Sequence, residues 1–161
     1  MADEMKAAPD EIDKYLKLLA ETPRRIASVS KGIENARLQS KTEQEPWSTN
    51  DILAHLRSCA DAWGKTIQEM LLKDNPTLPY VHPRQWIKKT NYLEIDFHIS
   101  LQAFTAQRKE LLKLLKNLAF EDWSRASIIR GREHTVFTQT RRMATHENDH
   151  CEHIKDILKS L

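Results

Sequence analysis

Four long segments with apolar residues at helical spacing make up most of this sequence of 161 residues, which contains only three glycines. Residues three or four apart lie on one face of a helix, so each segment predicts an amphipathic helix with one buried side. The segments cover about residues 9–29, 48–72 and 92–116, and the fourth runs from about residue 135 onward; the third could begin as early as Trp86. Four such helices bury their apolar sides by packing together, so we expect an all-α four-helix bundle.

The residues between and within these segments indicate where helices begin and break. Pro23 interrupts the first segment, which we interpret as one helix with a kink or a brief break. Ser48 and Asp51 have the spacing of a capping box, which predicts the start of the second helix. Residues 73–90 contain three prolines and no sustained period, so we expect a long crossover connection over the surface. For residues 126–134 we expect a short irregular segment that can include an extended piece.

Length and composition limit the number of domains and the kinds of partner that the chain can have. An apolar content of 40% over residues 1–161 suits a single domain with a sizeable core. The 25 basic and 23 acidic residues are spread along the chain, so no nucleic-acid partner is expected. Residues 1–6 lack the apolar core of a signal peptide, and no apolar run reaches membrane-spanning length. We therefore expect a cytoplasmic protein without a membrane partner, in which Cys59 and Cys151 are free thiols.

Three histidines form the strongest candidate site. His146 and His150 are four residues apart, so on a helix they point in nearly the same direction and can bind one divalent ion together. His55 lies on the buried stripe of the second segment and is the candidate third ligand. Catalytic zinc sites commonly take three protein ligands and keep one position open. Because imidazole suits several metals, the pattern predicts a divalent ion, with zinc or nickel favoured.

Each member of this cluster also has a simpler interpretation. A histidine on an apolar helix face is more often a hydrogen-bonded core residue, and a pair four residues apart also arises by chance. His153 is close enough to the same face to be a ligand or a hydrogen-bond donor to one, but ranks below the other three. Cys59 is a candidate fourth ligand, although a small buried filler is its simpler role. The remaining histidines stand singly and are assigned no metal: His82, His98 and His134.

Charged residues beside the pair give two further candidate roles. Glu147 follows His146 as the general base follows the first histidine in zinc proteases, and the spacing agrees. The all-helical scaffold argues against a protease, so a solvated acid on the helix surface is the simpler interpretation for Glu147 and for Asp149. Arg141 and Arg142 stand one turn before His146, where a guanidinium could hold a substrate carboxylate or a thiol cofactor. Solvation at the surface is the default for both arginines.

Three runs together resemble the DinB-like superfamily, which includes YfiT-type proteins. They are Glu45–Leu56, in which a Trp-Ser turn leads into a His-Leu helix, Ala103–Leu112, and His146–Ile154. The resemblance extends over nearly the whole chain. It implies a four-helix bundle of up-down-down-up type with a long crossover, often dimeric, that holds a divalent metal by three histidines. Carried over by position, the resemblance implies that these ligands are His55, His146 and His150.

The resemblance also implies a chemistry. Family members of known activity are mostly transferases or isomerases that use low-molecular-weight thiols such as bacillithiol or mycothiol. Our first hypothesis is therefore a metal-dependent enzyme, a thiol S-transferase or a hydrolase, in which a thiol or water at the open metal position attacks a small-molecule substrate. The alternative is a non-catalytic metal-binding or stress-response interaction protein, whose metal only stabilises the bundle. A third reading has no metal and three packed, hydrogen-bonded histidines. A homodimer is expected.

Overall fold

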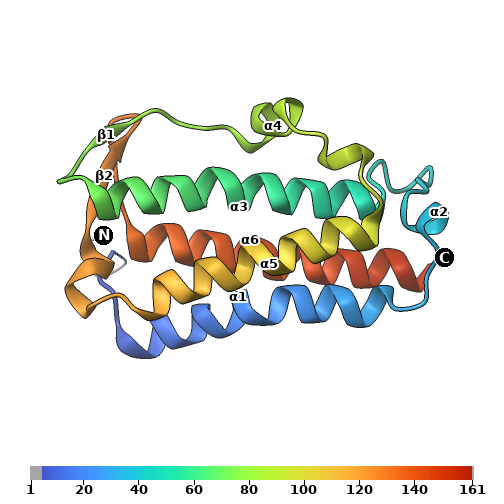
Figure 1. Ribbon diagram of the computed structural model, residues 1–161, viewed down its shortest axis with the longest axis horizontal. Coiled ribbons are helices and arrows are strands. Elements are labelled where there is room, and N and C mark those ends of the chain that lie inside the picture. Colours follow the sequence, from blue (N-terminus) through green and yellow to red (C-terminus); the bar gives the residue numbers. More distant parts are fainter. Residues whose placement is uncertain (1–4, 161) are drawn as a thin grey trace.

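Four long helices lie side by side in the computed structural model, which describes residues 5–160 (Figure 1). They are α1 (Pro9–Ser30), α3 (Thr49–Leu72), α5 (Phe97–Lys116) and α6 (Val136–Lys159). Helix α1 packs against α5 and α6, and α3 packs against the same two helices, so each helix has two neighbours around the bundle. The predicted four-helix bundle is confirmed. No helix within residues 5–160 is both long and apolar enough to cross a membrane.

Short elements lie at the two ends of the bundle and in its long crossover (Figure 1). Helix α2 (Asn35–Leu38) follows α1, and α4 (Pro83–Trp86) lies in the long crossover that follows α3 (Figure 1). A small sheet has the strand order β1 (Thr77–Leu78), β2 (Ala126–Ile129) and β3 (Arg132–Thr135), with β1 parallel to β2 and β2 antiparallel to β3. This sheet ties the start of the crossover to the connection between α5 and α6, and it contains the extended piece expected there.

The crossover is also fastened to α3 by side chains. Asp61 of α3 accepts hydrogen bonds from Trp86 Nε1 at 3.0 Å and from Tyr92 Oη at 2.6 Å. Trp86 belongs to α4, and Tyr92 begins a 3₁₀ turn that ends at Glu94. The crossover therefore follows the outer side of α3 (Figure 1) instead of leaving the bundle.

The structure agrees with the sequence prediction for the first long helix and differs from it at the start of the third. Despite Pro23, α1 is one continuous helix, as interpreted. The third long helix starts at Phe97, so the predicted start near residue 92, and the earlier start at Trp86, are wrong. The reason is a contact across the bundle, because Asn35 Oδ1 accepts the backbone N–H of Phe97 at 2.8 Å. Ile95 is extended and Asp96 is not helical, and Asn35 supplies the partner for a first-turn amide that a longer helix would have bonded itself.

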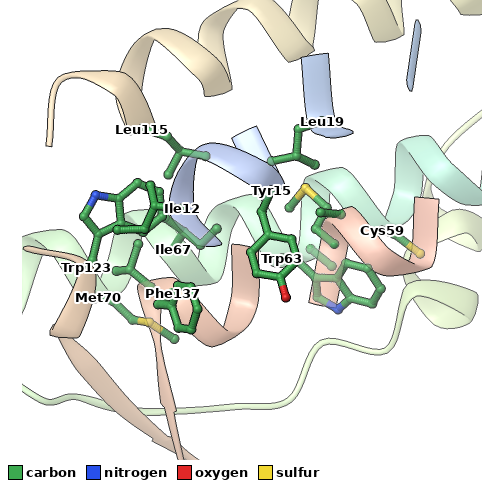
Figure 2. Close-up of a cluster of buried hydrophobic side chains, with 14 residues drawn as sticks. Ile12, Tyr15, Leu19, Cys59, Trp63, Ile67, Met70, Leu115, Trp123 and Phe137 are labelled. Carbon is green, nitrogen blue, oxygen red and sulfur yellow. The ribbon is translucent and has the colours of Figure 1, made fainter. Parts of the chain in front are cut away.

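The core divides into two clusters of buried side chains. Figure 2 shows one of them, in which Trp63, Ile67 and Met70 of α3 meet residues of α1, α5 and α6. The other contains Ile52 and Leu56 of α3 with apolar residues of all the other long helices. Helix α3 thus contributes to both clusters, and this extensive burial fixes its rotation against α6.

The capping box at the start of α3 gives a first prediction. Asp51 donates its N–H to Ser48 Oγ, and Ser48 donates its N–H to Asp51 Oδ2, both at 3.0 Å. Replacing Ser48 with alanine is expected to lower the free energy of unfolding by about 1 kcal/mol, since one amide loses its partner. Urea denaturation measures the change. Ser40→Ala, at an exposed serine, is the matched control, and equal stability of the two variants would contradict the role of the cap.

Candidate metal centre

The three predicted histidines come together where α3 packs against α6. His55 lies in the second turn of α3, and His146 and His150 lie one turn apart in α6. Their Nε2 atoms converge, at 3.3 Å between His55 and His146 and at 3.1 Å between His150 and His146. One ligand atom from each residue lies within 4.8 Å of those of the other two. The structure therefore brings together all three residues that the sequence singled out.

These distances fit a shared ion better than a chain of hydrogen bonds. Two nitrogen ligands at 2.0–2.1 Å from a tetrahedral zinc ion lie about 3.3 Å apart. Both short contacts involve Nε2 of His146, and one imidazole nitrogen has either one proton or one lone pair, so it cannot satisfy both neighbours. A cation at the convergence point would accept all three lone pairs. The donor set, three imidazole nitrogens, is one that zinc, nickel and other divalent metals accept.

Two tryptophans enclose the cluster. The ring of Trp47 lies 5.1 Å from that of His55 and is nearly parallel to that of His150 at 6.5 Å, measured between ring centroids. The ring of Trp63 meets His146 edge-on at 5.1 Å. The three imidazoles are half-buried, because these indoles cover them from two sides without closing the site. Such rings limit the freedom of the imidazoles and keep their nitrogens directed at one point.

Cys59 is close to the cluster but stands outside it. Its Sγ lies 3.6 Å from His55 Nε2. Cys59 is nevertheless not a member of the group whose ligand atoms all lie within 4.8 Å of one another. Burial, followed by the charge of Glu147, raises the pKa of the Cys59 thiol to about 12. The position of Cys59 therefore favours the role of buried filler and leaves room for an open metal position.

His153 is held by a different partner. Its Nε2 lies 2.9 Å from Glu45 Oε2, and its ring centroid lies 6.3 Å from that of His150. Glu45 stands just before Trp47, so this pair ties the loop that contains Trp47 to α6. Among the described residues, His153 is not part of the three-histidine group.

Glu147 differs from its predicted role. It is fully buried, and its carboxylate accepts hydrogen bonds from both terminal nitrogens of Arg108, at 2.6 Å and 2.5 Å, and from Thr22 Oγ1 at 2.8 Å. The interpretation as a solvated acid is wrong, because α1 and α5 cover this side of α6. With its carboxylate committed to α1 and α5, Glu147 is no general base of the zinc-protease kind. Asp149 is exposed, as expected.

The cavity beside His55 contains residues that sequence reasoning missed. It has a volume of about 330 Å³ and is walled by Trp47, Ile87 and Leu93, with Lys41 and Arg84 as cations. Lys41 Nζ already lies 3.5 Å from Asp51 Oδ2, whereas Arg84 stands 5.9 Å over the Trp47 ring. Lys41 lies in the connection between α2 and α3, and Arg84 lies in α4 of the crossover, so the two cations meet at the site only in the folded chain. No sequence pattern could have indicated this.

Burial of the histidines gives a prediction for the metal-free protein. Burial first, then the neighbouring histidines, lowers the pKa of His55 from 6.5 to about 4, and burial with His150 and Arg142 does the same for His146. The unfolded chain therefore binds more protons than the folded one between about pH 6.5 and pH 4, and the free energy of unfolding should fall as the pH falls through this window. Urea denaturation across this range measures it. A His55→Gln, His146→Gln variant should show a flatter profile, and an unchanged profile would contradict the assignment.

Comparisons with known proteins agree with this architecture. A sequence profile of the DinB superfamily matches residues 18–154. The fold superposes on that of YfiT from Bacillus subtilis with a TM-score of 0.83 and 15% identity, covering 96% of this chain and 90% of that one. YfiT is described as a probable metal-dependent hydrolase with an unusual four-helix bundle topology. No curated protein matches the chain in sequence.

Proposed function

We propose that this chain, which belongs to the DinB superfamily, is a metal-dependent enzyme whose divalent ion is held by His55, His146 and His150. The observation that carries the proposal is the convergence of three Nε2 atoms at the separations that ligands of one ion adopt. Zinc or nickel is the ion we favour. The likeness to YfiT, described as a probable metal-dependent hydrolase, supports hydrolysis as the first reaction to test.

An ion in such a site would lower the pKa of a water molecule or a thiol in its open position and so supply a nucleophile near neutral pH. Hydrolysis uses the water, and transfer of a low-molecular-weight thiol uses the thiol. The residues of this chain serve both reactions in the same way. Arg84, exposed at the mouth of the cavity, can hold negative charge on the substrate, and Trp47 offers an aromatic wall beside His55. A volume of about 330 Å³ suits a small-molecule substrate.

Two features favour an enzyme over a purely structural metal site. Structural zinc sites are closed, with four protein ligands. Within residues 5–160, the group that can share one ion has three members, and the nearby Cys59 is not one of them. The cavity lined by His55 reaches the cluster, so a substrate has a path to it. A site that served stability alone would need neither an open position nor a cavity.

The test is turnover that depends on both the metal and the histidines. Metal-free protein is loaded with zinc or nickel and given small esters, amides and phosphoesters, with and without an added low-molecular-weight thiol and an alkylating electrophile. Turnover without thiol identifies hydrolysis, and turnover only with thiol identifies transfer. Both should disappear in His150→Ala and persist in His98→Ala, whose histidine is exposed on α5. Tight metal binding that raises the melting temperature without any turnover would support the non-catalytic alternative.

A further inference from the structure

A second cavity lies at the end of the bundle that holds the small sheet. Its volume is about 190 Å³, and it lies between the crossover, the hairpin of β2 and β3, and the facing sides of α3 and α6. A cavity of about 150 Å³ can hold a benzene molecule, so this one suits a small organic ligand. We call it the arginine cavity, after three of its lining residues: Arg130, Arg132 and Arg142.

The charge of this cavity is one-sided. Besides the three arginines it is lined by His134, and none of its described lining residues is acidic. Burial, and then the charges of Arg142 and Arg132, lower the pKa of His134, which agrees with a positive field at this point. Like charges gathered around one space repel one another, and an anion bound between them would relieve that repulsion.

Two of the guanidinium groups are held by aromatic rings. Arg142 lies 4.8 Å from the ring centroid of Trp63, and Arg130 lies 4.1 Å from that of Tyr80. Stacking occupies the flat face of a guanidinium and leaves its N–H groups, which lie in the plane, able to donate. Arg130 and Gly131 both have positive φ, 52° and 73°, so the tight turn between β2 and β3 directs the hairpin that carries Arg130 and Arg132.

Buried polar atoms in the wall provide an independent sign of a ligand. Trp63 is 6% exposed and Gln139 is 3% exposed, and both line the cavity. Trp63 Nε1, a donor, has no hydrogen-bond partner among the described residues, and neither has Gln139 Oε1, an acceptor that an anion would not satisfy. Buried polar groups are nearly always bonded, and an indole N–H needs an acceptor. A ligand oxygen in the cavity would supply the acceptor that Trp63 lacks.

We propose that the arginine cavity binds the anionic oxygen group, carboxylate or phosphate, of a small organic acid. The indole of Trp63 is a shared wall, since the same ring contacts His146 at 5.1 Å. An acid bound in the cavity would contact the same indole that packs against His146. That the bound acid is part of the substrate rests on the proposed function. Anion binding itself does not.

The test follows the indole N–H signals of ¹⁵N-labelled, metal-free protein in NMR titrations with benzoate, phenyl phosphate and the neutral benzyl alcohol. The Trp63 signal, assigned with Trp63→Phe, should shift and saturate with an anion. The signal of Trp86, which already donates to Asp61, should not move. Benzyl alcohol should produce no saturating shift. The preferred anion shows whether the site selects carboxylate or phosphate.

Variants decide whether the arginines cause the binding. An Arg132→Gln, Arg142→Gln protein should bind the preferred anion at least about tenfold more weakly, because two charged donors are lost. Arg24→Gln makes the same change at an exposed position outside the cavity and should bind like the parent protein. Unchanged affinity in the double variant, or equal binding of benzyl alcohol, would overturn the proposal. Because the protein is metal-free, failure of the metal proposal would leave this result intact, and the reverse also holds.

Discussion

Replacing Glu147 with leucine is expected to lower the free energy of unfolding by about 3–5 kcal/mol. The carboxylate is fully buried and is the charge partner of Arg108, whose side chain is also buried. Without it a guanidinium would remain in the core, and a guanidinium cannot lose its proton to escape that state. Thr22 would lose its acceptor as well. Urea denaturation, with the midpoint and the slope both fitted, measures the loss.

Two further variants make this prediction specific. Asp149→Leu places the same side chain two residues away at an exposed position, and its stability should stay close to that of the parent. Arg108→Met combined with Glu147→Leu removes both charges and should recover most of the lost stability, as replacement of buried ion pairs by apolar side chains often does. A loss below about 1 kcal/mol in Glu147→Leu alone would mean that this pair is not sealed in the core.

The second large effect concerns the ion. His55→Ala is expected to weaken zinc binding by at least about a hundredfold, more than the 10- to 100-fold that follows loss of a residue that only supports a ligand. The reason is that α6 alone supplies two nitrogens, and the third comes from α3. Competition against a chromophoric chelator measures the affinity. His98→Ala, exposed on α5, is the matched control and should bind zinc as the parent does.

His153 separates the three-histidine site from a looser cluster. Because its Nε2 is paired with Glu45, we expect His153→Ala to change zinc affinity by only a few fold. If His153→Ala instead weakened binding as strongly as His55→Ala, the site would have a different set of ligands from the one proposed.

Local patterns in the sequence were sufficient for the four long helices and for the histidine pair of α6. Apolar spacing indicated the four long helices, and Ser48 with Asp51 indicated the start of α3, because these signals arise within one or two turns. The pair His146 and His150 likewise needs one helix only. Placing His55 opposite them required that α3 face α6, which the resemblance to a known family implied.

Features that depend on contacts between distant segments were not predictable in this way. The start of α5 at Phe97 depends on Asn35, which stands 62 residues earlier in the chain. The sequence around Glu147 is that of a surface acid, because its burial depends on α1 and α5. Arg108, which lies among apolar residues of the third segment, was a signal for a buried acid, since a buried charge needs a partner. The arginine cavity collects side chains from α3, the crossover, the hairpin and α6.

Three of the expectations from the sequence are not tested by the structure. The homodimer, the cytoplasmic location and the organisation of residues 1–161 as one domain stay predictions. Residues 1–4, on which the expected absence of a signal peptide partly rests, lie outside the described residues.

X-ray absorption spectroscopy of the zinc-loaded protein, prepared without an affinity tag and desalted, tests the central claim most directly. Three histidines with an open position predict three imidazole nitrogens at about 2.0–2.1 Å, completed by oxygen from solvent, in protein that retains about one zinc per chain. A sulfur ligand at about 2.3 Å would show that Cys59 closes the site. That result, or a protein that retains no zinc, would contradict the account.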